Sequence, residues 1–553
     1  MQAQRSRTNR LLAILIALFL LVTALPFACW WGVSRLRAAV TPPEPTLRLA
    51  YSPEKRELLG QLLAEFERQG LRTTSGAPMR VAAVEMLPER MVRLAVEGQV
   101  DAVCPDSSLW LTETDQRWRE TFLRDGVLVG EAVRFAISPV VIAMREDVAR
   151  SMGYPDRPIG WMDILERAQT EETFSWSHAS TSTASGLLAT LAQFYAGAGK
   201  TRGLTIEDAT AQSTLDYVAA VEATVRHYGE GELATVERAL EEGELRLDAF
   251  VVQEQLVVYY NGRGSDRLVA VYPAEGTLWE DHPLALLEHA DLDNDARETF
   301  QALKRHLLSP QSQQVVLQHG YRPADLSIPL TGEGSPLTAA NGVDPTQPKT
   351  VLQMPSAAVV DVVRDVWWYT KRHTNVFLVV DTSGSMQGDK LENARLGLQA
   401  FVEGIRGDQE RVGMIEFASE VGRTIPLDEL GRNRRALEQA IADLSAGGNT
   451  ALLDAIGAAY GRLQSLGDAE RINAIVVMTD GRENASRTRL RELQMRIRDG
   501  NARGVPVVVF CIAYGSDADL DTLAAIAETS GGQVRRGDLT SIEELYRLIS
   551  TYF

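Results

Sequence analysis

The chain has 553 residues, of which 45% are hydrophobic and 24% are charged, proportions that are typical of globular proteins. At about 100–200 residues per domain, this length predicts about two to four folded units. The net charge of −18, together with the lack of a basic stripe or zinc-finger spacing, argues against nucleic-acid binding. Three dispersed cysteines, Cys29, Cys104 and Cys511, exclude a disulfide framework.

The first forty residues predict a membrane anchor. Residues 11–34 carry no charge and are mostly apolar, which is long enough for a helix that spans a bilayer. Arginines flank the run on both sides, with the stronger cluster before it, and Trp30 and Trp31 lie near its end. We therefore predict a cytoplasmic stub and transmembrane helix over residues 1–40, with the rest of the chain outside the cytoplasm. A cleaved signal peptide and a lipoprotein signal ending at Cys29 are alternatives, and both also export the chain.

The next region, residues 45–329, alternates strands with helices. Strands are predicted at residues 47–51, 79–85 and 101–104, and helices lie between them. This order predicts a parallel sheet, in which ligands bind at the carboxyl ends of the strands. The loops there offer hydroxyls and backbone N–H groups near helix starts, which favours an anion.

Further along, residues 134–144 predict a strand that crosses into a second lobe. A hydroxyl-rich turn at residues 178–186 precedes a helix, residues 255–260 predict a strand, and residues 268–277 predict the return crossing. Residues 309–322 predict a closing helix that ends in Gly-Tyr-Arg-Pro.

This succession resembles the type 2 periplasmic solute-binding proteins of ABC importers, over about residues 47–327. The matching motifs are AYS at 50–52, DAVCPDSSLW at 101–110, SPVVIAM at 138–144, GWMDIL at 160–165, HASTSTASGLLA at 178–189, VYPAEGT at 271–277 and GYRP at 320–323. The resemblance implies two α/β lobes, joined by two crossings, with a small ligand between them. It implies a cleft lined by Ser52, Ser107, Ser108, Ser180, Thr181, Ser182, Glu254 and Tyr259. The competing interpretation is that many of these hydroxyls cap helices or form turns.

Residues 330–372 predict a linker followed by a helix that leads into the last domain. Glycine and proline interrupt residues 330–350, which have no hydrophobic period. Residues 355–371 have Val359, Val363, Val366 and Trp367 on one helical side.

The last region, residues 373–553, predicts a doubly wound, Rossmann-like α/β sheet. Apolar runs at residues 376–380, 412–417, 474–478 and 505–512 are typical of parallel strands buried on both faces. A weaker edge strand is predicted near residues 424–426, and helical segments separate most of these strands.

The loops at the carboxyl edge of this sheet carry a set of oxygen ligands. Asp381, Ser383 and Ser385 follow the first strand, Thr450 opens a helix, and Asp480 follows a later strand. Carboxylates and hydroxyls without histidine or cysteine suit Mg²⁺ or Mn²⁺, with Ca²⁺ as a further option, and argue against zinc.

This set resembles the metal-ion-dependent adhesion site of von Willebrand factor A domains. The resemblance implies that Ser383, Ser385 and Thr450 bind the metal directly, and that Asp381 and Asp480 bind it directly or through water. An open coordination position would then accept a carboxylate from a protein partner. The alternative is a vestigial site, in which these side chains only cap helices.

Together these patterns predict a membrane-anchored, extracytoplasmic binding protein. Its last domain would bind an acidic group of a protein partner through the metal, and its lobe pair would sense a small ligand or act as a scaffold. The alternatives are a transport receptor with an accessory metal domain and a subunit of a metal-dependent enzyme complex. No catalytic motif is present, so we expect no enzyme activity and assign no catalytic residue.

Overall fold

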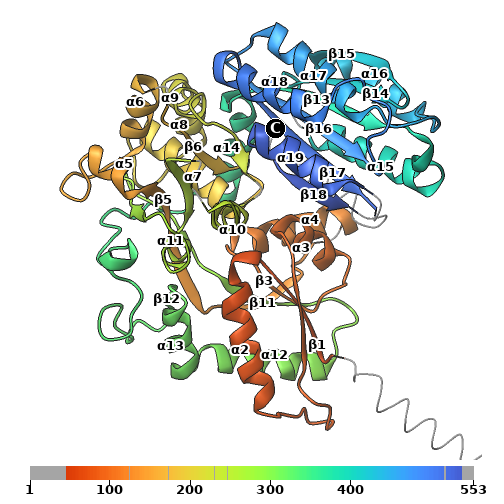
Figure 1. Ribbon diagram of the computed structural model, residues 1–553. Coiled ribbons are helices and arrows are strands. Elements are labelled where there is room, and N and C mark those ends of the chain that lie inside the picture. Colours follow the sequence, from red (N-terminus) through yellow and green to blue (C-terminus); the bar gives the residue numbers. More distant parts are fainter. Residues whose placement is uncertain are drawn as a thin grey trace, which may run out of the picture.

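The computed structural model describes residues 45–537, except for eight single positions: 124, 172, 230, 244, 246, 406, 516 and 517 (Figure 1). The predicted anchor at residues 1–40 lies outside the described residues. Within them, no helix is both long and apolar enough to cross a membrane. The described chain folds into two lobes and a C-terminal domain (Figure 1).

The first lobe is built on a five-stranded sheet in the order β2-β1-β3-β11-β4. Strands β2, β1 and β3 run parallel, as the sequence predicts, and β11 is antiparallel to β3 and β4. The strands are β1 (Leu47–Tyr51), β2 (Val81–Glu85), β3 (Ala102–Cys104), β4 (Val129–Arg134) and β11 (Pro283–Leu287). The helices are η1 (Pro53–Lys55), α2 (Arg56–Arg68), α3 (Pro88–Val96), α4 (Leu109–Phe122), α12 (Asn294–Leu307) and α13 (Pro310–Gln318).

The second lobe is built on a seven-stranded sheet in which the long strand β5 pairs with four others. The strands are β5 (Ala136–Arg145), β6 (Trp176–Ala179), β7 (Tyr228–Gly229), β8 (Ala249–Gln253), β9 (Leu268–Val271), β10 (Trp279–Glu280) and β12 (Arg322–Pro323). The helices are α5 (Glu146–Ser151), α6 (Trp161–Thr170), α7 (Ala184–Gly197), α8 (Ile206–Thr210), α9 (Gln212–Glu222), α10 (Glu232–Glu242) and α11 (Glu254–Asn261).

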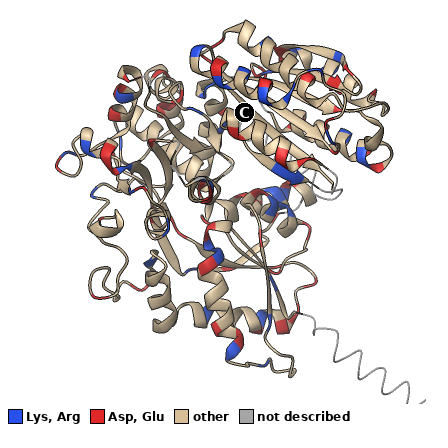
Figure 2. Cartoon of the chain, in the orientation of Figure 1, with Lys and Arg blue, Asp and Glu red and all other residues tan. Residues whose placement is uncertain are grey.

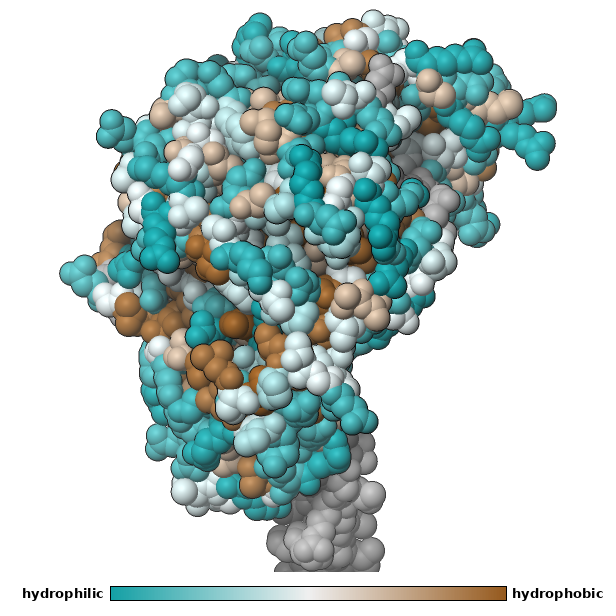
Figure 3. Space-filling view, turned by 90° about the vertical axis from the view of Figure 1, so that its left-hand side faces the viewer, coloured by the Kyte–Doolittle hydropathy of each residue, from teal (hydrophilic) through white to brown (hydrophobic). Residues whose placement is uncertain are grey.

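Two connections join the lobes. The first runs from β4 into β5, as predicted, and the second runs from β10 into β11. The predicted return crossing at residues 268–277 lies too early, because β9 still pairs with β5 in the second lobe. Figure 3 shows apolar side chains gathered on one face of the molecule, at about the height at which the two lobes meet.

The strand predicted at residues 255–260 is wrong, because this segment is the helix α11. The preceding strand β8 fills the place between β5 and β6 in the sheet, where it pairs with both strands. In α11 the buried residues Leu256, Val257 and Tyr260 follow helical spacing and face the core.

The segment predicted as a linker packs against the second lobe. Leu337 and Val343 are buried in its core, and the N–H of Ala270 donates to the carbonyl of Gly342 at 2.7 Å. The predicted helix follows as α14 (Ala357–Thr370), which packs on α7, α8 and α9 through Val359, Val363 and Trp367. The chain is therefore attached to the lobe up to the start of the C-terminal domain.

The C-terminal domain is a six-stranded sheet in the order β15-β14-β13-β16-β17-β18. All neighbours are parallel except the antiparallel edge strand β15, and helices pack over two apolar cores. The strands are β13 (Thr374–Asp381), β14 (Arg411–Phe417), β15 (Val421–Glu429), β16 (Ile472–Thr479), β17 (Val507–Tyr514) and β18 (Val534–Gly537). The helices are η3 (Gly384–Met386), α15 (Asp389–Gly404), α16 (Leu430–Ala442), α17 (Leu452–Leu466), α18 (Leu490–Arg503) and α19 (Leu520–Ser530).

A buried ion pair joins α14 to this domain. The Lys371 ammonium lies 2.9 Å from a Glu410 oxygen, and both side chains are fully buried. Glu410 also accepts hydrogen bonds from the N–H and hydroxyl of Thr374, at 2.6 and 2.5 Å. Burial alone would raise the pKa of Glu410, but the Lys371 charge and these hydrogen bonds outweigh burial and lower it to about 2.

We predict that Glu410→Ala destabilises the C-terminal domain by about 3–5 kcal/mol, because it removes the buried carboxylate that pairs with the Lys371 ammonium. Urea unfolding of the full chain, followed by circular dichroism, measures this loss. The control is Glu403→Ala, an exposed position on α15, which should change stability by less than about 0.5 kcal/mol. Equal effects of the two variants would contradict the account.

Because the folded pKa of Glu410 lies below its usual 4.5, the contribution of Glu410 to the free energy of unfolding should persist at neutral pH and be lost as the pH falls toward 2.

Candidate functional site

Three loops at the carboxyl edge of the C-terminal sheet bring the five predicted metal ligands together. Strands β13 and β16 are parallel neighbours, with Val380 opposite Met478, so Asp381 and Asp480 leave the sheet side by side. Of the five residues, Ser385 is exposed, while the four others are at most 3% exposed. The opening toward solvent is therefore at the Ser385 side.

Hydrogen bonds link the ligand oxygens directly. The Ser385 hydroxyl donates to Oδ1 of Asp480 at 2.7 Å, and the Ser383 and Ser385 hydroxyls lie 3.0 Å apart. A Cβ placed on Gly481 would lie 3.1 Å from Oγ1 of Thr450 and 3.4 Å from Oγ of Ser385. The Thr450 hydroxyl thus lies close to the Ser385 hydroxyl, and a side chain at residue 481 would crowd both hydroxyls.

The inner end of the site is held by Asp381 and Thr479. The N–H of Ser383 donates to Oδ1 of Asp381 at 2.7 Å, and the Thr479 hydroxyl donates to Oδ2 at 2.5 Å. Oγ1 of Thr479 in turn accepts from the N–H of Gly481 at 3.1 Å. Burial raises the pKa of Asp381. These bonds fix the carboxylate at the base of the loop, where it orients Ser383.

Sequence reasoning missed one residue of this site, Lys390. Its ammonium pairs with Oδ2 of Asp480, and its side chain is 31% exposed. Lys390 lies in the first turn of α15, one residue after Asp389, which begins the helix. A lysine five residues after the last serine of the motif has no recognisable signal in sequence. It supplies positive charge where a divalent cation would otherwise neutralise Asp480.

The donor set fits a hard cation. Two carboxylates and three hydroxyls meet in one place, and nitrogen enters only as the Lys390 ammonium, which cannot act as a ligand while protonated. Oxygen sets of this kind suit Mg²⁺ or Mn²⁺. When bound, such an ion would be held by Ser383, Ser385 and Thr450, with Asp381 and Asp480 nearby, and it would attract a carboxylate.

The predicted cleft residues of the first lobe lie at the ends of β1 and β3. Ser52 is fully buried, accepts a hydrogen bond from Lys55 at 2.5 Å and donates to Glu54 at 2.7 Å. Ser107 is buried at the start of α4, where its hydroxyl accepts from the N–H of Leu109. Ser108 is exposed. Ser52 and Ser107 are therefore buried and hydrogen-bonded within the first lobe, while Ser108 is open to solvent.

The hydroxyl-rich loop of the second lobe faces the first lobe. The hydroxyls of Ser180 and Ser182 lie 2.5 Å apart, and Thr181 is buried. Ala184, which follows at the start of α7, packs against Trp110 of the first lobe. The N-cap of α7 is Thr183, which accepts from Gly186. The alternative interpretation of caps and turns applies to Thr183, which caps α7, and also to Ser180, whose hydroxyl accepts from the N–H of Ser182 at 3.3 Å.

The structure places Glu254 and Tyr259 in other roles. Both Glu254 oxygens are bound by the Arg322 guanidinium, at 2.7 and 2.8 Å, and one also accepts from Tyr272. Tyr259 lies on α11 beneath the guanidinium of Arg263, 3.9 Å from the ring centre. Neither side chain joins the serines in a common site.

Two family models match the chain along separate regions. A model of bacterial extracellular solute-binding proteins matches residues 47–322, and a model of von Willebrand factor type A domains matches residues 375–547. The chain joins a solute-binding domain to a von Willebrand factor A domain. The first match covers the two lobes, and the second covers the sheet whose carboxyl edge carries Asp381 and Asp480.

Among curated relatives, inter-alpha-trypsin inhibitor heavy chain H4 of Sus scrofa is 28% identical over 167 residues, which is 29% of this chain and 18% of the relative. The chain thus spans about a fifth of that protein. Among solved structures, a von Willebrand factor type A protein from Catenulispora acidiphila has 21% identity and a TM-score of 0.29, covering 33% of this chain and 43% of its own. The sulfate-binding protein SubI from Mycobacterium tuberculosis H37Rv has 15% identity and a TM-score of 0.37, covering 51% and 88%. At these identities and scores the structures carry no information about ligands.

We predict that Glu254→Gln lowers the stability of the solute-binding domain by about 3 kcal/mol or more, because Arg322 loses its buried counter-charge. Thermal unfolding of the full chain measures the loss. The matched control, Glu241→Gln, changes an exposed carboxylate of the same domain and should leave stability almost unchanged. If Glu254→Gln were as stable as the control, Glu254 would not be held in place by Arg322.

Proposed function

We propose that this chain is an extracytoplasmic binding protein whose von Willebrand factor A domain recognises a protein partner through a divalent metal ion. The observation that carries the proposal is the convergence of Ser383, Ser385 and Thr450 with Asp480 on the carboxyl edge of the sheet. Ser385 is exposed, so an ion held there would face solvent. Hydroxyl ligands donate weakly, and such an ion would attract a carboxylate of the partner.

The solute-binding domain supports a second part of the proposal, a small ligand held between its lobes. The lobes meet closely, because Arg56 pairs with Glu237 and Arg263 pairs with Glu57 across the boundary, each at 2.8 Å. Basic and acidic residues are interspersed along the helices (Figure 2). The lobe pair would sense a ligand or hold the A domain in position.

We further propose that the chain is exported and stays attached to the membrane through its first forty residues. The support is the uncharged run at residues 11–34, with arginines on both sides. The family model for residues 47–322 describes extracellular proteins. We assign no enzyme activity to the chain.

Hydrogen exchange with mass spectrometry tests the metal site locally. In the full chain, Mg²⁺ should slow exchange in peptides that cover residues 381–386 and 479–484, because a bound ion stabilises the state that binds it. Asp480→Asn should abolish this protection, while Asp389→Asn, which changes an exposed carboxylate nearby, should retain it. If Mg²⁺ does not slow exchange in the unaltered chain, the site binds no metal and the interpretation as a vestigial site holds.

We predict that Lys390→Met raises the affinity of this site for Mg²⁺ by about two- to fivefold, because the ammonium no longer competes for Asp480. The factor corresponds to a partly exposed ion pair worth up to about 1 kcal/mol. Lys390→Arg retains the charge and should leave the affinity near that of the unaltered chain. The Mg²⁺ concentration that gives half of the exchange protection measures the change. A lower affinity in Lys390→Met would show that Lys390 supports metal binding instead of opposing it.

A further inference from the structure

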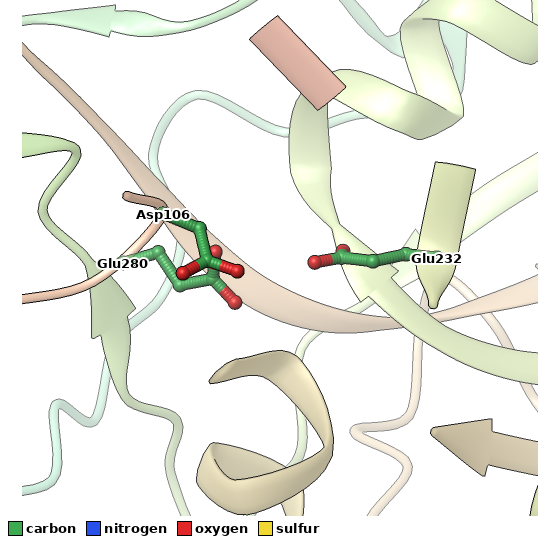
Figure 4. Close-up of side chains that lie close together, drawn as sticks. All are labelled: Asp106, Glu232 and Glu280. Atoms are coloured by element: carbon green, nitrogen blue, oxygen red, sulfur yellow. The ribbon is translucent and has the colours of Figure 1, made fainter. Parts of the chain in front are cut away.

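Three carboxylates from separate segments meet between the two lobes. Asp106 follows β3 in the first lobe, Glu232 begins α10 in the second lobe, and Glu280 ends β10 just before the chain crosses back. One oxygen of each lies within 4.8 Å of the others. Figure 4 shows Asp106 and Glu280 next to each other, with Glu232 pointing toward them from the opposite side.

These carboxylates are buried and incompletely paired. Glu280 is 0% exposed, Asp106 is 5% and Glu232 is 7%. Within the described part of the chain, neither oxygen of Glu280 has a hydrogen-bond partner, and nor does Oδ1 of Asp106. Buried carboxylates almost always have partners. A fully buried carboxylate with two unpaired oxygens, aimed at two others, therefore points to a missing ligand.

Glu232 is held in position for this ligand. One of its oxygens accepts from the N–H of Gln253 at 2.5 Å, and the other accepts from the side-chain amide of Gln253 at 2.8 Å. Each oxygen of an ionised carboxylate has a second lone pair. The Gln253 bonds thus fix the direction of the carboxylate and leave it able to bind a cation.

The nearest buried cation, Lys55, is already paired. Its ammonium lies 2.5 Å from Glu54 and 2.5 Å from the hydroxyl of Ser52, and 3.3 Å from Nδ1 of His282. Lys55 pairs with Glu54, so its charge does not offset that of the three carboxylates when they ionise. Burial, reinforced by the neighbouring carboxylates, raises the pKa of Asp106 to about 7 and that of Glu232 to about 8.

We propose that the solute-binding domain holds a divalent metal cation between its lobes, bound by Asp106, Glu232 and Glu280. Oxygens around an ion with bonds of about 2.0–2.6 Å lie at most about 5 Å apart, and these three satisfy that limit. Carboxylate ligands without nitrogen or sulfur favour hard ions such as Ca²⁺, Mn²⁺ or Mg²⁺. The buried carboxylates would repel an anion, which is the kind of ligand that the hydroxyl-rich loops favour in the sequence analysis.

This ion would also hold the lobes together. Asp106 belongs to the first lobe and Glu232 to the second, while Glu280 lies on the connection between them. Without a cation, three buried carboxylates at this distance repel one another. The closed arrangement seen here is therefore the one that a cation stabilises.

Mn²⁺ binding to the full chain, counted by electron paramagnetic resonance, tests this inference. The reference protein is Asp480→Asn, which disables the site of the von Willebrand factor A domain. It should still bind one Mn²⁺, and adding Glu280→Gln should weaken that binding by about tenfold or more. The control adds Asp281→Asn instead, which changes the neighbouring carboxylate, a hydrogen-bond acceptor for Ser108, and should leave the affinity unchanged.

The outcomes separate the two sites. If Asp480→Asn binds no Mn²⁺ while the unaltered chain binds one, the cleft site is wrong and the A-domain site stands. If the loss occurs with Glu280→Gln and not with Asp480→Asn, the cleft site stands and the A-domain site is wrong. Equal Mn²⁺ affinity with and without Glu280→Gln also overturns the cleft site.

Folding of the variants is checked by thermal unfolding without metal. Glu280→Gln replaces a buried, unpaired carboxyl whose pKa is raised by burial, so its melting temperature should be at least that of Asp281→Asn. Mn²⁺ should then raise the melting temperature of Asp480→Asn and fail to raise that of the protein with Glu280→Gln added. Asp106→Asn provides a second variant with the same expectation. No Mn²⁺ effect in Asp480→Asn would mean that protons neutralise the carboxylates, which would overturn the proposal.

Discussion

The candidate site of the C-terminal domain depends on one constraint, the convergence of parallel strands at a single edge of a sheet. Parallel strands buried on both faces end together, and their loops must meet there. Because β13 and β16 are neighbours, two loops almost a hundred residues apart in sequence place Asp381 beside Asp480. The pairing of β1 with β3 places Lys55 and Glu54 beside Asp106 in the same way.

The two domains are joined by packing rather than by a free tether. Residues 330–350 pack against the second lobe, and α14 packs on the helices of that lobe. At the end of α14, Lys371 forms a buried ion pair with Glu410 of the C-terminal domain. Helix α10 makes another contact, because Arg238 donates to the carbonyl of Gly531 at 2.8 Å. The same helix begins with Glu232, so one rigid element touches both the space between the lobes and the A domain.

Much of this architecture follows from patterns in the sequence. The apolar runs of the C-terminal sheet and the crossing strand β5 are periodic signals, and the structure places them as expected. The five oxygen-bearing side chains of the motif lie close together, although their role as metal ligands stays a prediction. The residues that sequence reasoning missed lack such signals. Glu232 looks like an ordinary acidic residue at a helix start, Glu280 ends a two-residue strand, and 174 residues separate Asp106 from Glu280. Only tertiary packing brings them together, and it also makes residues 254–261 helical.

The central claim is that the chain holds two separate sites for hard divalent cations, one between the lobes and one on the A domain. The most direct measurement is an anomalous difference map from crystals of the chain grown with Mn²⁺. The account predicts one peak bounded by Asp106, Glu232 and Glu280 and another bounded by Ser383, Ser385 and Thr450. A map without the first peak, in crystals with the lobes closed and the carboxylates buried, would contradict the cleft site, and a map without the second would contradict the proposed mode of partner binding.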